Sequence, residues 1–448
     1  MNSSAMFSDS HPGLFTDLYE LIMARAYLTR NMTGRALFSL HFRHLPKDRN
    51  FLLACGQNYL VQMIRELRFP ADQVDFLADM DQFDEDFLDW LRNFRFTGDI
   101  RVLPEGTPVF PHEPLVEVEA PIAEAQMLET LVMNYVGTET VLASKAVRMV
   151  MAAQGRPVVD FGIRRMHGLD SALRSARAYR VAGIAATSNV RGSQLYGLPV
   201  NGTMAHSYIQ ASGDETDAMR TYARLYPGTT LLVDTYDTLA GVDKVIGLAR
   251  DEGLEVGSIR LDSGDLGELA AEARNKLDKA GLNDIRIVAS SGLDEWKIRE
   301  LINQGAPING FGVGTELGVS GDAPVVDLVY KLTEYDGRPC LKKSPGKLLL
   351  PGRKQIWRQT GKNRLYQGDI LGLYEENHEG EPLLHSVMRN GELLESPPEP
   401  GDSRDRVQET LTHMPPELLQ PDGAQRKYPV TISDRLKALH QQALRDVS

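Results

Sequence analysis

The middle of the chain alternates short apolar runs with stretches of helical periodicity. The runs typical of strands begin at Val158, Ala185, Val200, Leu231, Ser258, Arg286, Gly310 and Val325. In one of the intervening stretches, Ile298, Leu301 and Ile302 recur at helical spacing and the pattern stops at Gly305. Strands that alternate with helices pair in parallel, and about eight of them predict a βα barrel of irregular form.

The segments on either side of this region carry different patterns. Residues 1–125 mix helical stretches with strands and turns, whereas residues 333–448 open with a turn at Pro351-Gly352 and end in a short amphipathic helix. The length also favours more than one domain. We therefore expect an N-terminal segment over 1–125, the barrel with the chemistry over 126–332, and a C-terminal segment over 333–448.

Composition excludes several classes of protein. No apolar run approaches the roughly 18 residues that suggest a membrane span, and residues 1–10 lack the features of a signal peptide. Two isolated cysteines, Cys55 and Cys340, argue against a disulfide framework and a cysteine-based metal site. The net charge of −12, without a basic and aromatic stretch, argues against nucleic acid as a partner. We expect a cytoplasmic protein that does not bind membranes.

Polar residues gather where the predicted strands end. Seven such tails follow apolar runs, at residues 160–165, 187–189, 202–206, 234–237, 262–265, 290–292 and 312–315. The carboxyl ends of barrel strands form the face that holds active sites. A turn or a helix cap explains one tail, but seven in succession favour a composite site.

Two of these tails are short turns rich in backbone donors. Gly312, Gly314 and Thr315 form one, and the turn at Ser290 forms the other. Backbone N–H groups at such places bind phosphate, and the last strands of a barrel often carry a phosphate site. The alternative for each is a tight turn that requires glycine. The glycine spacing does not match the dinucleotide or the P-loop motif, so any use of ATP is not of the P-loop kind.

Three further tails carry charged or nucleophilic side chains. In Asp262-Ser263-Gly264-Asp265 the carboxylates suit ribose hydroxyls or a Mg²⁺ ion, and a helix N-cap explains them equally well. Arg164 follows Phe161, so a guanidinium fork for a carboxylate lies near a ring that can stack, although a structural salt bridge is the alternative. His206 lies in a glycine-led strand end, where a nucleophilic or acid-base role and a structural role are equally open.

Taken together, the motifs resemble the nicotinate phosphoribosyltransferase family. The matching segments, in family order, are residues 16–20, 161–165, 187–190, 202–206, 232–238, 260–265, 312–315, 329–332 and 351–355. The resemblance implies an irregular βα barrel with an additional α/β sandwich domain built from N- and C-terminal segments, as in type II phosphoribosyltransferases. It also implies an ATP-coupled transfer of phosphoribose from phosphoribosyl pyrophosphate to nicotinate, with Mg²⁺, in a homodimer with active sites near the subunit interface.

The resemblance also implies roles for individual residues. His206 would be the catalytic histidine that ATP phosphorylates, and Asp262 would be catalytic and bind the ribose hydroxyls. Arg164 would contact the nicotinate carboxylate, with Arg260 near the ring, and Tyr19 would stack on the ring, across the subunit interface if the dimer places it there. The other substrate-binding candidates are Phe161, Thr203, Ser263 and Gly264, together with Ser290, Gly312, Gly314 and Thr315 for the 5′-phosphate.

Two alternatives stay open at this stage. One is a nicotinamide phosphoribosyltransferase, against which Arg164 stands because no acid follows it. The other is a catalytically inactive barrel that binds nucleotides, against which His206 and Asp262 argue. One departure from the family pattern is Ser291-Gly292, where many members have Asn-Asp, so a side-chain role at this turn is open.

Overall fold

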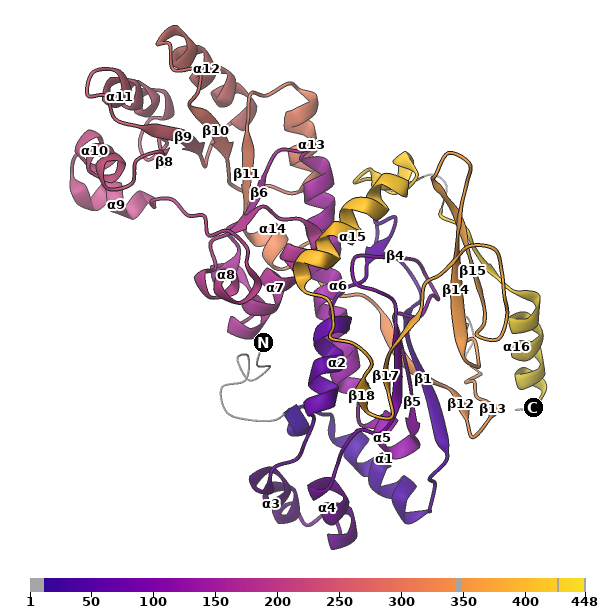
Figure 1. Ribbon diagram of the computed structural model, residues 1–448. Helices are drawn as coiled ribbons and strands as arrows, with labels where there is room; N and C mark the ends of the chain where they lie inside the picture. Colours follow the sequence, from indigo (N-terminus) through magenta and orange to yellow (C-terminus); the bar gives the residue numbers. More distant parts are fainter. Residues whose placement is uncertain (1–11, 344–347, 425–426, 447–448) are drawn as a thin grey trace. The chain divides into compact units, whose positions relative to one another are not determined.

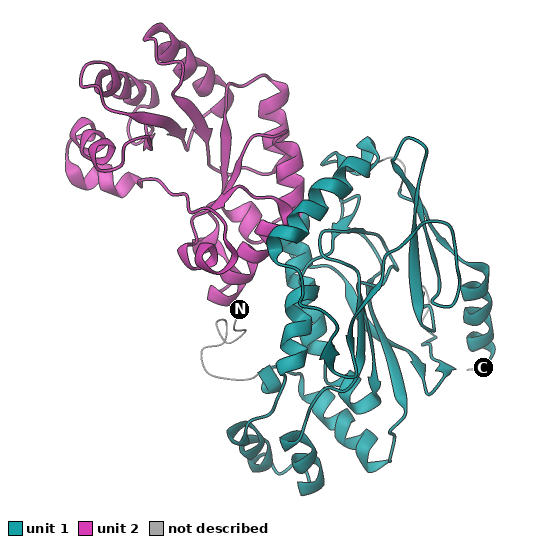
Figure 2. Cartoon of the chain, viewed as in Figure 1, with its two compact units in different colours: residues 1–144, 323–448 teal, residues 145–322 magenta. Residues whose placement is uncertain are grey.

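The computed structural model describes residues 12–343, 348–424 and 427–446 (Figure 1). The chain divides into two compact units (Figure 2). Unit 1 joins Met1–Ser144 to Ala323–Ser448, and unit 2 is Lys145–Asp322. Residues 126–144 and 323–332, which the sequence pattern places in the barrel, therefore group with unit 1. The reason is that α6 (Glu129–Ala152) is one helix whose first half packs into the core of unit 1.

Unit 1 is built on a seven-stranded sheet with the order β13-β12-β1-β5-β3-β17-β18. Its strands are β1 (Arg35–Phe42), β3 (Asp99–Val102), β5 (Val116–Pro121), β12 (Leu328–Tyr335), β13 (Arg338–Pro339), β17 (His385–Arg389) and β18 (Glu392–Leu393). Every neighbouring pair in this sheet is antiparallel. Strands from both ends of the chain thus share one sheet.

Helices and a second sheet complete unit 1. The helices are α1 (Leu18–Thr29), α2 (Gln57–Glu66), α3 (Ala71–Asp79), α4 (Glu85–Arg92), α5 (Ile122–Gln126), α15 (Pro400–His413) and α16 (Asp434–Asp446). The second sheet has the order β16-β14-β15-β19, and a short pair joins β2 to β4. These strands are β2 (Leu52–Leu53), β4 (Pro108–Val109), β14 (Lys354–Thr360), β15 (Tyr366–Leu373), β16 (Glu381–Pro382) and β19 (Val430–Ile432). Helix α5 packs against β1 and β5, and α16 packs against β15.

Two of the motifs that carry the family resemblance, residues 16–20 and 351–355, have structural roles in unit 1. In the first, Glu20 accepts hydrogen bonds from the backbone N–H (2.9 Å) and the hydroxyl of Thr130, and so caps the first turn of α6. Burial raises the pKa of Glu20 to about 7, although these hydrogen bonds oppose the shift. In the second, the ammonium of Lys354 lies 3.2 Å from the buried Glu117, which also pairs with Arg101. The cluster thus pairs a buried carboxylate of β5 with two cations.

A second charged cluster in unit 1 surrounds Asp369 on β15. The guanidinium of Arg358 pairs with this carboxylate at 2.6 Å, and the hydroxyl of Tyr428 donates to it at 2.9 Å. Glu113 is fully buried next to them and accepts a hydrogen bond from the N–H of Phe110 at 2.8 Å. Burial, and then the negative charge of Asp369, raise the pKa of Glu113 well above its usual value.

Glu113→Gln should therefore stabilise the protein increasingly as the pH rises from 5 to 8. The folded state holds the Glu113 proton more tightly than the unfolded chain does. The contribution of protonated Glu113 to the free energy of unfolding is fully present below the pKa of this group in the unfolded chain, and it is lost as the pH rises through the pKa in the folded state. Glutamine mimics the protonated acid and removes this loss. Thermal unfolding across this pH range measures the difference in stability between the variant and the wild type. Glu417→Gln, at an exposed position, is the control. A difference in stability that does not change with pH would contradict the prediction.

Unit 2 carries the parallel sheet that the sequence predicts, in the order β7-β6-β11-β10-β9-β8. Its strands are β6 (Val158–Asp160), β7 (Ala186–Thr187), β8 (Thr229–Leu232), β9 (Val256–Leu261), β10 (Arg286–Ala289) and β11 (Gly310–Val313). The helices of the unit after α6 are α7 (Leu169–Ala182), α8 (Val190–Tyr196), α9 (His206–Ser212), α10 (Glu215–Leu225), α11 (Thr238–Arg250), α12 (Leu266–Lys279), α13 (Glu295–Asn303) and α14 (Thr315–Gly318).

Two of the eight predicted strands do not join this sheet. The run that starts at Val325 becomes β12, which pairs with β1 in unit 1. Val200 makes only a single bridge, to Thr187, because Pro199 before it has no N–H to donate. Among the described residues the sheet has six strands, with β7 and β8 at its edges, and forms a half-barrel. None of the described helices is both long enough and apolar enough to cross a membrane.

Candidate active site

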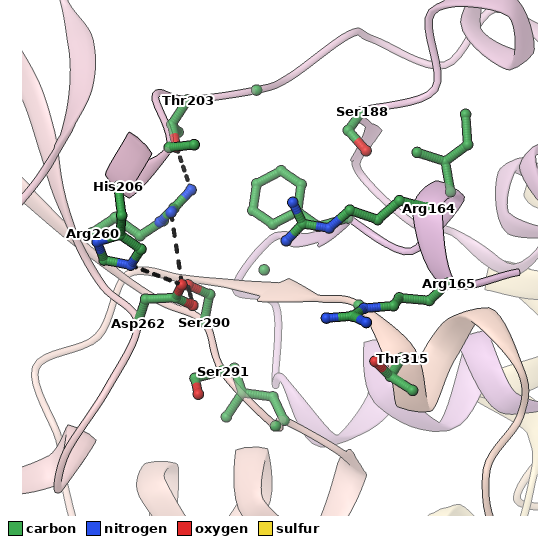
Figure 3. A pocket seen from close by; sticks show the side chains of 18 of the residues that line it. Arg164, Arg165, Ser188, Thr203, His206, Arg260, Asp262, Ser290, Ser291 and Thr315 are labelled. Atoms are coloured by element: carbon green, nitrogen blue, oxygen red, sulfur yellow. Dashed lines mark hydrogen bonds and ion pairs between the residues drawn. The ribbon is translucent and has the colours of Figure 1, made fainter. Parts of the chain in front are cut away.

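A cavity of about 680 Å³ opens at the carboxyl ends of the unit 2 strands (Figure 3). This volume is in the range of small-molecule sites. The candidate residues that line it are Phe161, Arg164, Thr203, His206, Arg260, Asp262, Ser290, Gly312, Gly314 and Thr315. They come from the carboxyl ends of β9 and β11, from the turns after β6, β9, β10 and β11, and from the start of α9 with the segment before it. The structure thus brings into one pocket residues that lie up to 154 positions apart.

Three candidates lie outside the lining of this pocket. The hydroxyl of Ser263 donates a hydrogen bond of 2.8 Å to Asp234, and Gly264 has a φ of +75°, which a tight turn requires. Both residues thus shape the turn that carries Asp262. Tyr19 belongs to unit 1, where it lies on α1 with 41% of its surface exposed.

Of the two glycines at the carboxyl end of β11, Gly312 is the one without space for a side chain, since a Cβ atom on Gly314 would make an ordinary contact of 3.6 Å. A Cβ atom on Gly312 would lie 2.4 Å from the ring of Phe161. Gly314 precedes α14 directly, so the backbone of this turn faces the cavity without side chains. Such a turn can donate N–H groups to an anion.

The turn after β10 has an unusual backbone. Ser291 and Gly292 have φ values of +88° and +56°, so two successive residues are left-handed. This conformation is unfavourable for serine, and asparagine tolerates it better. The Ser291-Gly292 departure therefore keeps the backbone shape of the turn at some cost in strain. Both residues line the cavity.

Asp262 is held at the pocket wall by its neighbours. Its Oδ1 accepts a hydrogen bond of 2.6 Å from the hydroxyl of Ser290, and its N–H donates to Asp234 at 2.7 Å. Its Oδ2 lies 3.8 Å from the guanidinium of Arg260 and 3.7 Å from Nε2 of His206. Asp265, by contrast, caps α12 by accepting from two backbone N–H groups at 3.0 Å. Within this motif the pocket role and the cap role thus fall to different carboxylates.

His206 is the first residue of α9 and points toward Asp262 (Figure 3). Its Nδ1 lies 3.1 Å from the hydroxyl of Thr235, and 40% of the side chain is exposed. The contact with Thr235 occupies Nδ1 and leaves Nε2 facing the pocket. An imidazole held in this way can act as a nucleophile through Nε2.

Arg260 and Arg164 supply positive charge to the pocket. Arg260 donates to the hydroxyl of Thr203, and burial lowers the pKa of its guanidinium, although Asp262 and Asp234 oppose this shift. A guanidinium starts from so high a pKa that it stays charged. Arg164 and Arg165 belong to the short 3-10 helix Ile163–Arg165 and extend into the cavity (Figure 3).

Sequence reasoning missed two carboxylates that shape the pocket, the buried Asp160 and the partly buried Asp234. Asp160 accepts hydrogen bonds from the N–H of Gly162 (2.7 Å) and the hydroxyl of Thr187 (2.6 Å), and so joins two strand-end turns. Burial raises the pKa of Asp160. Asp234 accepts from the turn of Asp262, as described above. Both lie in strand-end tails, and this position in the sequence could have marked them as candidates. Only the fold shows which groups they contact.

Known proteins resemble this chain along most of its length. Models of the nicotinate phosphoribosyltransferase (NAPRTase) N-terminal domain, family and C-terminal domain match residues 14–137, 157–344 and 376–440. The chain is 48% identical over 426 residues to nicotinate phosphoribosyltransferase pncB2 of Mycobacterium tuberculosis, covering 94% of this chain and 92% of that protein. It is 35% identical over 475 residues to nicotinate phosphoribosyltransferase of Bacillus subtilis, covering 98% and 97%.

A solved structure resembles the fold closely. The crystal structure of human nicotinic acid phosphoribosyltransferase matches with a TM-score of 0.84 and 28% identity, covering 95% of this chain and 99% of that one. This match confirms the predicted fold class, a barrel-like unit with a sandwich domain built from both ends of the chain. This chain therefore belongs to the nicotinate phosphoribosyltransferase family and is an enzyme that converts nicotinate into nicotinate mononucleotide.

Proposed function

We propose that the pocket of unit 2 transfers phosphoribose from phosphoribosyl pyrophosphate to nicotinate and couples this reaction to ATP. The observation that carries the proposal is the convergence of His206, Asp262, Arg164 and two donor-rich turns on one cavity. The family relationship makes the chain an enzyme, which removes the alternative of an inactive barrel. Nicotinate mononucleotide and pyrophosphate are the products.

The residues of the pocket suit this transfer. Breaking the bond between C1 of the ribose and pyrophosphate develops positive charge on the sugar, and the carboxylate of Asp262 can stabilise that charge. The ring nitrogen of nicotinate is already a nucleophile, so the protein mainly positions the reactants. The turns at Gly312–Thr315 and Ser290 would hold the 5′-phosphate, and Arg164 would bind the carboxylate of the base.

Two carboxylates fit a Mg²⁺ ion. Asp234 Oδ1 is buried and has no hydrogen-bond partner within the described part of the chain. Asp262 lines the pocket, and its N–H donates to the other oxygen of Asp234 at 2.7 Å. Mg²⁺ prefers such oxygen ligands and would neutralise the charge of the departing pyrophosphate. Asp234 and Asp262 are therefore the residues that we expect to hold it.

ATP would act through His206. Nε2 would attack the γ-phosphorus, the bond to the ADP oxygen would break, and the phosphoryl group would remain on the imidazole. The modification adds roughly two negative charges within a few ångströms of Asp262. We infer that this change alters the binding of both substrates and that hydrolysis of the phosphohistidine restores the initial state.

Exposed apolar residues in both units support a homodimer. On and before α1, Phe15, Leu18, Tyr19 and Ile22 are 40–59% exposed, and in unit 2 Leu169 is 81% exposed. Apolar groups that gather on one helix face usually mark an interface. A second copy would cover them and would bring its α1 to this chain. Light scattering of the purified protein tests the proposal, and a monomer at micromolar concentration would contradict it.

The state of the two cysteines bears on the cellular compartment of the protein. Neither Cys55 nor Cys340 forms a disulfide bond. A reducing cytoplasm keeps cysteine thiols from forming disulfides. We therefore propose a cytoplasmic enzyme, which fractionation of cells with an antibody against this chain would test.

A turnover assay tests the reaction itself. The protein is incubated with phosphoribosyl pyrophosphate and Mg²⁺, with either nicotinate or nicotinamide, and with or without ATP. We expect mononucleotide from nicotinate, at a rate that ATP stimulates. Product from nicotinamide alone would assign the chain to the nicotinamide-using relatives and would contradict the role of Arg164.

Arg164→Leu should raise the KM for nicotinate by about 10- to 100-fold, which is the loss expected for a charge-assisted hydrogen-bonded pair. The KM for nicotinamide, which has no carboxylate, should change much less. Steady-state kinetics with both bases measures the difference. Arg191→Leu is the control, because Arg191 pairs with Gln194 on α8 and does not line the pocket. An equal rise in the KM for both bases would show that Arg164 does not bind the carboxylate of nicotinate.

A further inference from the structure

A buried ionic cluster lies behind the two phosphate-binding turns. Lys145 on α6 has no exposed side-chain surface, and its ammonium lies 2.6 Å from Glu295 and 2.7 Å from Asp322. Arg148, one turn further along α6, contacts the other oxygen of Glu295 at 2.7 Å. Both cations also lie over the ring of Trp296. Two positive and two negative groups thus balance in the interior of unit 2.

The two anions belong to the segments that form the turns. Glu295 is the first residue of α13 and follows the turn at Ser290 by five positions. Asp322 follows α14, which begins directly after Gly314. A backbone hydrogen bond links this segment to the turn, because the N–H of Gly321 donates to the carbonyl oxygen of Glu316, a residue of the pocket wall, at 3.2 Å.

The sheet alone joins these turns only at their origins. Strands β10 and β11 pair at two positions, Val288 with Gly310 and Ala289 with Phe311. Beyond these residues the two segments no longer pair with each other, although β11 continues along β6 as far as Val313. Beyond that point, the ammonium of Lys145 contacts both segments at once. A lysine holds two carboxylates at fixed separation because each contact is a short, charge-assisted hydrogen bond in a site that excludes water.

We propose that Lys145 is a positioning residue for phosphoribosyl pyrophosphate. It sets the spacing of the turns at Ser290 and at Gly312–Thr315, so that donors from both reach one phosphate group. The inference rests on the proposed function of these turns. It predicts that loss of the link weakens binding of phosphoribosyl pyrophosphate and leaves the binding of nicotinate unchanged, since Arg164 and Phe161 belong to other turns.

The test compares Lys145→Met with Asp322→Asn. Both cut the link between the turns, but Asp322 is partly exposed, so its variant keeps the test possible if the first fails to fold. Each should raise the KM for phosphoribosyl pyrophosphate by about tenfold, as small misplacements of binding groups do, with less than a twofold change for nicotinate. Calorimetric titration of the substrate with Mg²⁺ should show the same loss of affinity.

Lys244→Met is the matched control. Lys244 also pairs with a buried glutamate of unit 2, Glu215, but this pair joins α10 to α11, away from both turns. A general loss of stability would change all three variants and both substrates alike, and that result would overturn the proposal. So would unchanged kinetics in both Lys145→Met and Asp322→Asn.

A variant of the proposed phosphate site separates this inference from the proposed function. Thr315→Ala removes a side chain of the proposed phosphate site itself. If Thr315→Ala weakens phosphoribosyl pyrophosphate binding but the Lys145 and Asp322 variants do not, only the positioning role is overturned. If none of the three variants weakens phosphoribosyl pyrophosphate binding, the assignment of the turns to the phosphate fails, and the inference fails with it.

Discussion

His206→Ala should abolish the stimulation of the enzyme by ATP and the transfer of phosphate from ATP to the protein. The ATP-dependent rate should fall at least about 100-fold, the lower range of what a catalytic group contributes. The reason is geometric: Thr235 occupies Nδ1 at 3.1 Å, and Nε2 faces the pocket 3.7 Å from Asp262. Alanine has no nucleophile to offer. The basal transfer without ATP should persist, because the phosphate turns and Arg164 are unchanged.

Radiolabelled ATP measures the expected loss directly. Label that is stable in base and labile in acid should appear on the wild-type protein and disappear in the variant. His167→Ala is the control, since His167 is exposed in the same unit and does not line the pocket. ATP-stimulated turnover in the His206 variant would contradict the phosphohistidine mechanism. Loss of label in the His167 variant would indicate His167 as the phosphorylated residue.

Asp262→Asn should lower kcat by about 100- to 1,000-fold, the range for removal of one group that stabilises charge in a transition state. Asparagine keeps the shape of the side chain and can keep the hydrogen bond from Ser290. It loses the negative charge that faces the ribose, and it also leaves Arg260 without its anionic neighbour at 3.8 Å. The effect should therefore appear in kcat with ATP and without it, unlike that of His206→Ala.

Asp265→Asn is a matched control within the same four residues. Asp265 caps α12, and asparagine caps helices about as well as aspartate. Its activity should equal that of the wild type, and its unfolding temperature should change little. Similar kinetics for the two variants would mean that the charge of Asp262 is not used in the reaction. Pre-steady-state measurements would locate the slow step if kcat changes.

The sequence could predict much of the site because its signals are local. Gly312 ends and Asp262 follows a strand of the parallel sheet, and such strands bring their carboxyl ends to one edge. His206 follows the run at Val200, which makes only a single bridge to this sheet. The sequence could not predict what Asp160 and Asp234 do, because their partners are set by distances across the sheet. The family motif at Lys354 likewise has its explanation in Glu117, which is 237 positions away.

The sequence by itself determined the class of fold, the alternation of strands and helices in the middle of the chain, and the strand-end residues that we propose for the chemistry. Periodicity and strand-end composition are properties of neighbouring residues, so they can be read along the chain. Only the tertiary structure decided that the run at Val325 pairs with β1 and that Asp262 faces the pocket while Asp265 caps a helix. It also placed Lys145 between two turns. These outcomes depend on which distant groups satisfy a buried charge or an open strand edge, and hydrophobic pattern does not specify partners.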